Sequence, residues 1–226
     1  MTPPPAWSLA VRVDASACWC AHRDGKPALG FVPAMARRRL SALARGCLHV
    51  AQQVQDEGDR ARLIFGSRHG EIAKTLGMLQ EIAAGEPISP AAFSHSVHNA
   101  IPGLWSILTG FTGECSAVAA GMDTLPMALL EAQGMLHDDP STPVVVVIAD
   151  EAFPEMLHSE AVEPGEGYAL ALRLSGGAPN LQLQPRSAAQ VAADPDLVLS
   201  WWSWWLQRHK ALVLPGERHD WLWNAA

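Results

Sequence analysis

The chain has 226 residues, which is enough for one domain with a buried core. Its 16 Lys and Arg against 23 Asp and Glu give a formal net charge of −7, which argues against general nucleic-acid binding. No apolar run approaches the roughly 18 residues of a membrane span, and the first residues lack the segments of a signal peptide. The four cysteines lack the spacing of a disulfide framework, so we expect a cytoplasmic protein with reduced thiols.

The first third of the chain predicts a strand and a basic helix. Residues 7–20 (WSLAVRVDASACWC) favour a strand that runs into a loop. Residues 35–57 carry one apolar stripe and predict a single helix ended by Gly58. The arginines of its first half form either a solvated face or a docking patch for an acidic partner; they are Arg37, Arg38, Arg39 and Arg45.

The middle of the chain alternates between strands and helices. Residues 62–67 (RLIFGS) predict a buried strand, and 71–84 predict an amphipathic helix. Residues 88–132 then predict a turn, an apolar helix, a short strand, a sharp turn at Gly121 and a second apolar helix. The runs 144–149 (VVVVIA) and 167–174 (GYALALRL) indicate two neighbouring strands. This order indicates an α/β fold whose mixed, mostly parallel sheet is flanked by helices.

The C-terminal region differs in composition. It begins at GGAPN (176–180), and residues 197–206 (LVLSWWSWWL) hold four of the nine tryptophans. As a helix this segment is apolar nearly all round, so we expect it to be buried or to lie in an interface. The last residues predict a final strand or arm. We therefore expect a domain over 1–175 and a Trp-rich extension over 176–226 that packs on the domain or on a partner.

A strand, a tight glycine turn and a helix form the elbow that presents a nucleophile at a helix N-terminus. Here Met122 stands at the turn and cannot act as a nucleophile, while Cys115 lies earlier, in the strand. A polar cluster either furnishes a Ser/His pair or satisfies backbone groups in a turn at a subunit contact; it comprises Ser94, His95, Ser96, His98 and Asn99. One open alternative is thus a small acyltransferase or hydrolase that uses Cys115 or Ser94 with a nearby histidine.

Cysteine and histidine spacing does not predict a metal site. Cys18, Cys20 and His22 lack a second ligand pair at a usual zinc spacing, so we expect packing thiols.

Several motifs resemble one family in order and spacing. RRRL, DEG and IFGS come first, and ISPAAFSHSVHNAIPGLWSILTGFTG places Asn99, Gly103 and Gly110 at the family's spacings. VVVVIADEA takes the place of a further conserved strand of that family. With these motifs the chain resembles the N-terminal half of β-ketoacyl synthases, the thiolase-fold condensing enzymes. SRHGE, FSHSVHNA, AAGMDT and GER further resemble the short chain-length factors of aryl-polyene and xanthomonadin-type clusters.

The resemblance implies an inactive member. An ungapped alignment places the family's catalytic cysteine at Met122, and a gapped one places it at Val118. The family's two catalytic histidines belong to a second half of its fold, which we expect this chain not to contain. The resemblance implies a chain-length factor without a cofactor, which forms a heterodimer with an active ketosynthase and serves chains bound to an acyl carrier protein.

Position in the family also implies roles for residues. The acyl-tunnel wall would come from Ile72, Thr75, Leu76, Leu79 and Phe93. The subunit contact would include His95, His98, Asn99 and Met122, and the carrier protein would dock on Arg37, Arg38 and Arg39. For the Ile and Leu positions, plain core packing is the alternative. A homo-oligomeric module that binds acyl chains is a third possibility for the whole protein.

Overall fold

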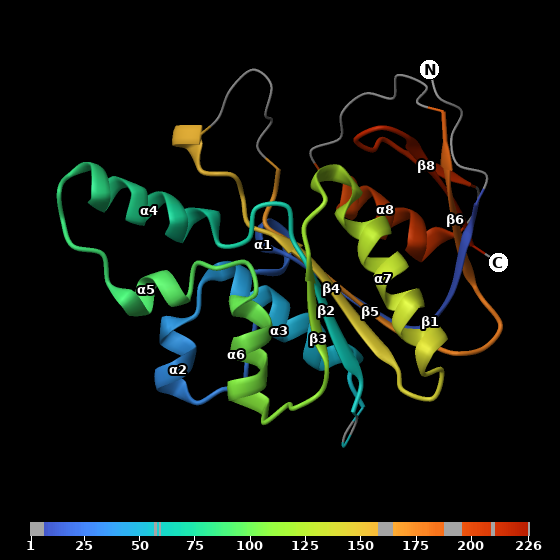
Figure 1. Cartoon of the computed structure of the whole chain (residues 1–226), viewed down its shortest axis with the longest axis horizontal. Coiled ribbons are helices and arrows are strands. Elements are labelled where there is room, and N and C mark those ends of the chain that lie inside the picture. Colours follow the sequence, from blue (N-terminus) through green and yellow to red (C-terminus); the bar gives the residue numbers. More distant parts are fainter. Residues whose placement is uncertain are drawn as a thin grey trace.

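The computed structural model describes residues 7–56, 58, 60–157, 165–187, 196–208 and 211–225. In this part of the chain one sheet of eight strands runs in the order β3-β2-β4-β5-β1-β6-β8-β7 (Figure 1). The strands are β1 Leu9–Cys20, β2 Arg62–Gly66, β3 Cys115–Val118, β4 Val144–Asp150, β5 Tyr168–Ser175, β6 Leu181–Arg186, β7 Leu212–Leu214 and β8 Asp220–Ala225.

The sheet is mixed, as predicted, but it is not mostly parallel. Only β2 runs parallel to its neighbours β3 and β4, whereas the five other pairs are antiparallel. The parallel strands are those joined through helices, as crossover connections require. A buried apolar run such as VVVVIA has the same pattern in either direction, so the sequence did not reveal that β5 turns back beside β4.

The helices are α1 Ala21–Asp24, α2 Ala34–Arg39, α3 Ala42–Val54, α4 Ile72–Ala83, α5 Pro90–Ser94, α6 Ala100–Thr109, α7 Thr124–Asp138 and α8 Leu197–Gln207. The single helix predicted over 35–57 is wrong, because the chain is extended at Leu40 and Ser41 starts a new helix. The Ser41 hydroxyl accepts a hydrogen bond from the Ala44 N–H at 3.0 Å, which is an N-cap. Helix α3 ends at Val54, before Gly58, and Glu57 lies outside the described residues.

The first strand is also longer than predicted. It does not run into a loop before Cys20, because it pairs with β6 over its first three residues and with β5 from Arg12 opposite Ser175 to Cys20 opposite Tyr168. This central position explains its alternating buried side chains.

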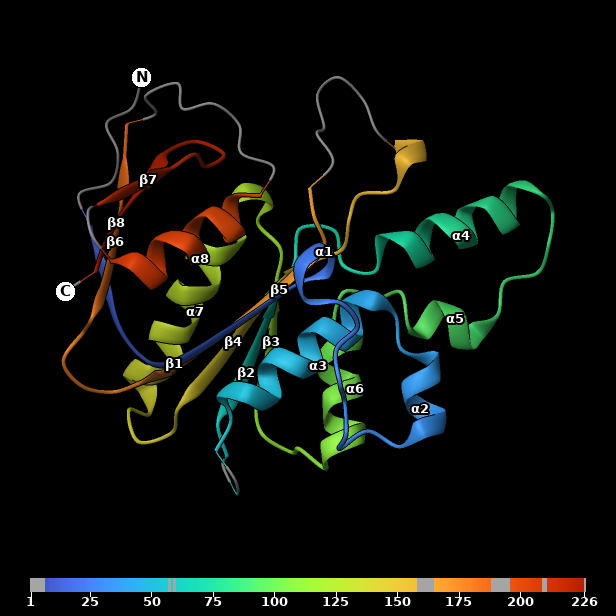
Figure 2. The ribbon, with the colours of Figure 1, turned by 180° about the vertical axis from the view of Figure 1, so that it is seen from behind.

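Helices cover both faces of the sheet (Figures 1 and 2). Successive β4 side chains point to opposite faces, so Val146 packs in the core beneath α7 and α8, and Val147 packs in the core beneath α3 and α6. Every residue of β4 is buried. The central strands are therefore covered on both sides within this one chain.

The Trp-rich segment packs on the chain's own sheet. Helix α8 buries Trp201 and Trp205, whose rings stack with centroids 5.5 Å apart, against Trp223 of β8. The Trp205 indole N–H donates to the Ser16 hydroxyl of β1 at 3.1 Å. The predicted final strand or arm is the antiparallel pair β7 and β8. Of the helices in the described ranges, α8 included, none is long and apolar enough to cross a bilayer.

Helices α4 and α5 project from the body of the molecule (Figures 1 and 2). They pack on each other, and neither contains a buried residue. We call residues 72–94 the arm. Its apolar residues Leu79, Ile82 and Phe93 are each more than half exposed, which is a large apolar exposure for so small a projection.

Candidate functional site at the elbow

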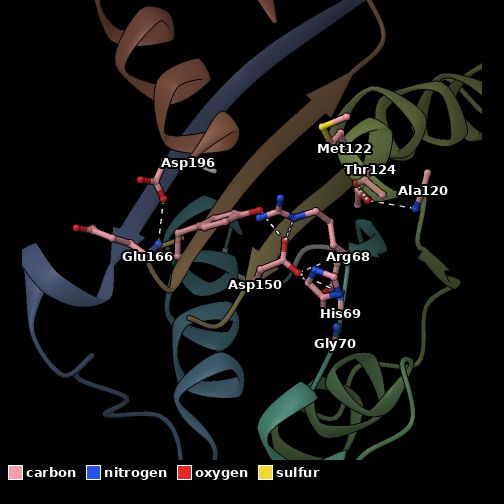
Figure 3. Close-up of polar contacts among 12 residues, drawn as sticks. Arg68, His69, Gly70, Ala120, Met122, Thr124, Asp150, Glu166 and Asp196 are labelled. Atoms are coloured by element: carbon pink, nitrogen blue, oxygen red, sulfur yellow. Dashed lines mark hydrogen bonds and ion pairs between the residues drawn. The ribbon is translucent and has the colours of Figure 1, made fainter. Parts of the chain in front are cut away.

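The predicted elbow is present, and we use the name for residues 120–124. Strand β3 leads to Gly121, whose φ of 55° lies in the left-handed region, and a short 3-10 turn over Gly121–Asp123 continues into α7. The Thr124 hydroxyl donates to the Gly121 carbonyl at 2.7 Å and accepts from the Ala120 N–H at 3.1 Å. Met122 therefore stands at the tip of a turn that its neighbours hold in place (Figure 3).

A buried carboxylate organises the strand ends beside the elbow. Asp150, at the end of β4, accepts hydrogen bonds from the Ser67 hydroxyl at 2.8 Å and from the Arg68 and His69 backbone N–H groups at 2.8 and 3.2 Å. It also accepts from Arg68 Nε at 3.1 Å and from the Tyr168 hydroxyl at 2.8 Å (Figure 3). This network fixes the SRHG turn after β2 against β4 and β5.

No sequence motif predicted this network. The available signal was an acidic residue directly after a fully apolar strand, because a buried carboxylate must find several donors. Burial, and then the charge of Asp150, raise the pKa of Tyr168 well above its usual value. Burial lowers the pKa of His69. Tyr168 therefore stays protonated at neutral pH and donates to Asp150, which is a structural role.

Little space remains beside Met122. The cavity between the elbow and Arg68, Tyr168 and α8 has a volume of about 10 Å³. That is about the space that one water molecule needs. This cavity is therefore too small for an acyl chain unless side chains move.

The residues assigned to a tunnel wall lie together on the arm. Ile72, Thr75 and Leu76 are half-buried on α4, whereas Leu79 and Phe93 are 56 % and 59 % exposed. The alternative of plain core packing is wrong for this set, because α4 contains no buried residue. Met122 is separate from them and lines the cavity beside Arg68.

The polar cluster follows the arm and does not form a Ser/His pair. His98 places Nε2 3.0 Å from the Ser67 carbonyl, and its ring lies 5.4 Å from that of Phe65, so it holds this segment to the end of β2. His95 and Asn99 are exposed. Ser94 and Ser96 donate to the carbonyls of Pro90 and Phe93, both at 2.9 Å, as residues of a turn do.

Cys115 has the environment of an unreactive thiol. Its Sγ lies 3.9 Å from the Gly113 carbonyl, and the residue occupies the edge strand β3. Burial and then the charge of Glu114 raise the pKa of Cys115, the opposite of what a nucleophile needs. In the part of the chain that the structure describes, Cys115 and Ser94 direct their side chains to the backbone carbonyls of Gly113 and Pro90 and not to a histidine.

The four arginines of α2 and α3 fall into two groups. The Arg37 guanidinium donates to the Leu29 carbonyl at 3.2 Å, and the Arg45 guanidinium donates to the Arg37 backbone carbonyl. Arg37 and Arg45 therefore stabilise local structure. Arg38 and Arg39 are exposed on α2. A groove of about 290 Å³ runs beside them, lined by Lys26, Pro27, Arg37, Arg38 and Arg45.

The other cysteines take part in local contacts. The Cys20 thiol donates to the Glu166 carboxylate at 2.7 Å, and burial raises the pKa of Cys18 to about 12. Cys47 is buried in the core beneath α3. The part of the chain that the structure describes contains no group of three His, Cys, Asp or Glu side chains placed to hold a metal ion.

Comparisons with solved structures identify the fold. A chain from the ketosynthase ApeO in complex with its chain length factor ApeC, from Xenorhabdus doucetiae, is 24 % identical with a TM-score of 0.85; the match covers 96 % of this chain and 99 % of that one. The ishigamide ketosynthase/chain length factor (17 % identity, TM-score 0.53) matches over 66 % of this chain and 50 % of its own. A β-ketoacyl synthase from Burkholderia phymatum STM815 (12 %, 0.52) matches over 74 % and 52 %.

These three similarities show a thiolase-like fold, and the match to the chain of the ApeO–ApeC complex spans nearly the whole of both chains. A search of curated proteins found no significant match. The sequence profile described as "Beta-ketoacyl synthase, N-terminal domain" matches residues 12–224. Because that match spans almost the entire sequence, the chain belongs to the β-ketoacyl synthase N-terminal domain family.

Proposed function

We propose that this protein is a non-catalytic chain-length factor, which pairs with an active β-ketoacyl synthase and shapes its acyl tunnel during aryl-polyene or polyketide (fatty-acid-like) chain elongation. The observation that carries the proposal is Met122 at the tip of an intact elbow. Condensation requires a thiolate to carry the acyl chain and donors for the oxyanion that forms. Methionine supplies no thiolate, and the cavity of about 10 Å³ between Met122, Arg68 and Tyr168 is too small for an acyl chain.

The solved complexes support the pairing part of this proposal. ApeC is named as the chain length factor of the ketosynthase ApeO, and the match to a chain of that complex covers 99 % of that chain. The other two matches cover only about half of theirs. A short member that pairs with a ketosynthase is therefore the arrangement we transfer to this chain.

Two surfaces of the chain suit a ketosynthase partner. Strand β3 lies at the edge of the sheet and pairs with β2 on one side, so its other side is available for a strand of the partner. The arm exposes Leu79, Ile82 and Phe93. We infer that the partner covers both, with more buried area than the ~1,600 Å² of an ordinary interface. The contact would include His95, His98 and Asn99.

Co-expression with the full-length ketosynthase of the same gene cluster tests the pairing. We expect the two proteins to co-purify and the chain made alone to be poorly soluble. Leu79→Glu and Phe93→Glu should reduce the recovered complex at least about tenfold, because each places an unpaired charge in an apolar contact.

The matched control is Leu206→Glu, because this leucine is 64 % exposed. It belongs to α8, a helix that lies on the opposite side of the molecule from the arm (Figure 2). This control should leave recovery unchanged. Equal recovery of the arm variants and the control, or a soluble and monodisperse chain without the ketosynthase, would contradict the pairing. Stable self-association with acyl-chain binding in the absence of the ketosynthase would favour the homo-oligomeric module instead.

We infer that the α4 side of the arm forms the far wall of the partner's tunnel, through Ile72, Thr75 and Leu76. Side-chain volume at a wall limits chain growth by steric exclusion. Thr75→Trp should therefore shorten the products of the co-expressed complex without preventing its assembly. Glu81→Trp is the control, since Glu81 is exposed and lies six residues after Thr75 on α4, which turns it about 120° away around the helix. Unchanged product lengths with Thr75→Trp would refute the wall.

We further infer that an acyl carrier protein docks on the basic patch of Arg37, Arg38 and Arg39. We take the carrier protein to be an acidic partner. The cluster of arginines would attract it locally, although the chain as a whole has a net charge of −7. The test uses Arg38→Glu with Arg39→Glu, because Arg37 also holds the Leu29 carbonyl. Carrier-dependent turnover of the complex should fall while assembly persists, and unchanged turnover would refute the patch.

A further inference from the structure

The loop between β7 and β8 closes over the elbow. The Glu217 carboxylate in this loop accepts a hydrogen bond from the Met122 backbone N–H at 3.0 Å. That N–H lies in the turn that leads into α7. Donors at the start of a helix lack partners within it and attract negative charge. Glu217 thus places its carboxylate on a backbone N–H at the start of the helical turn.

A second carboxylate, on the elbow itself, accepts hydrogen bonds from the loop and from β8. Asp123 Oδ1 accepts hydrogen bonds from the Glu217 backbone N–H at 3.2 Å and from the Trp221 indole N–H at 2.8 Å. Trp221 is itself buried in β8. The elbow therefore binds the loop through Asp123, and the loop binds the elbow through Glu217. We call this pair of contacts the clasp.

Two glycines allow the clasp to close. A Cβ atom at Gly121 would collide with the Glu217 carboxylate, and one at Gly216 would collide with Asp123 Oδ1 and with the His219 carbonyl. Gly121 also has a positive φ of 55°. Each side of the contact thus has a residue without a side chain at the point of closest approach, as a close packing of the two segments requires.

We propose that Glu217 is an internal plug, which occupies the oxyanion-binding N–H of the elbow and closes it to substrate. The inference rests on the proposed non-catalytic function and adds a second barrier to it. A backbone N–H at this position stabilises a developing oxyanion in acyl transfer. Here it is already engaged by a carboxylate, whose charge also repels an approaching anion. Replacing Met122 by cysteine alone would therefore not restore a reactive elbow.

A cysteine placed at the elbow reports on the plug. Met122→Cys is made in a Cys115→Ser background, so that the exposed native thiol is removed. The full chain, purified with its ketosynthase, is treated with iodoacetamide at pH 7.5, and mass spectrometry of the peptide containing residue 122 gives the rate. Glu217→Ala should raise this rate at least about tenfold, because it removes both the obstruction and the charge that disfavours the thiolate. Glu217→Gln should give an intermediate rate, since the amide oxygen still accepts the N–H.

Controls separate the plug from a loosened fold. Arg218→Ala changes an exposed neighbour in the same loop and should not accelerate the labelling of residue 122. Buried Cys47 reports global unfolding in the same digest. If iodoacetamide also alkylates Cys47 in the Glu217→Ala variant, the rate at residue 122 in the Glu217→Gln variant tests the plug instead. Alkylation rates of residue 122 that agree within about twofold, whether Glu217 is intact or changed by Glu217→Gln or Glu217→Ala, would overturn the plug. That result would leave the chain-length-factor proposal intact, whereas failed co-purification with the ketosynthase would overturn that proposal and not the clasp.

Discussion

The Tyr168 hydroxyl donates a 2.8 Å hydrogen bond to the Asp150 carboxylate, joining the facing ends of β5 and β4 beside the elbow. Both residues are 3 % exposed. The contact links the SRHG turn, which Asp150 holds, to β5. The sequence pattern predicts this strand but not its antiparallel direction. Tyr168 is the only tyrosine in the chain.

Tyr168→Phe tests how much this contact contributes to stability. The ring remains, but Asp150 loses one of its donors, so the free energy of unfolding should fall by about 1–2 kcal/mol. Asp150→Asn should cost more, because it also removes the charge paired with Arg68 at 3.1 Å. Pulse proteolysis in urea measures the unfolding of this chain in the presence of its partner. A change below about 0.3 kcal/mol for Tyr168→Phe would contradict the role.

Gly46 lies in α3 where the helix crosses Trp19 of β1. A Cβ atom there would be 2.6 Å from the Trp19 ring, so Gly46→Ala forces the layers apart. We expect a loss of about 1–3 kcal/mol, the usual cost of overpacking. Gly103→Ala is the control, because Gly103 lies in α6 with nothing within 4 Å of a Cβ. It should stabilise the chain by about 0.5–1 kcal/mol through helix propensity alone. Equal effects of the two substitutions would show that the helix does not rest on Trp19.

The sequence determined the local elements better than their directions. The elbow at Gly121, the central strand over 144–149 and the amphipathic arm follow from glycine placement and apolar periodicity, and the structure contains all three. The break at Leu40 was missed because the apolar stripe continues through it, although Ser41 is a typical N-cap residue. Pairing of β5 with β4 leaves the same buried apolar pattern in either direction, and its pairing with β1 joins segments far apart in sequence.

The candidate site was predictable only in part. Met122 could be placed by resemblance, and the structure puts it at the tip of the turn. Glu217 lies 95 residues away in sequence and meets Met122 only because β7 and β8 fold back beside the elbow. Asp150 likewise gains its donors from the turn after β2 and from β5. Contacts between distant segments of this kind carry no local signal beyond the residue types themselves.

Thiol labelling tests the alternative in which Cys115 is a nucleophile. Because burial and Glu114 raise its pKa, the thiolate fraction at pH 7 should be smaller than that of a free cysteine. Alkylation of Cys115 should be at least about threefold slower than that of a model thiol at pH 7. The rate should still rise with pH through 9, since deprotonation is incomplete there. A fast reaction at pH 7 with a plateau below pH 8, or transfer of an acyl group to Cys115, would favour the acyltransferase.

Trp201 tests whether the C-terminal segment belongs to the core of this domain. The side chain is fully buried beneath α8, stacked on Trp205 and packed edge-on against Trp223. Trp201→Ala leaves a large cavity and should lower the free energy of unfolding by about 3–5 kcal/mol. Leu206→Ala on the same helix is the control, and because Leu206 is 64 % exposed it should change stability by less than about 0.5 kcal/mol. Pulse proteolysis of both variants should separate them clearly. If Trp201→Ala instead weakens co-purification with the ketosynthase and leaves stability unchanged, the segment serves the partner and not the sheet of its own chain.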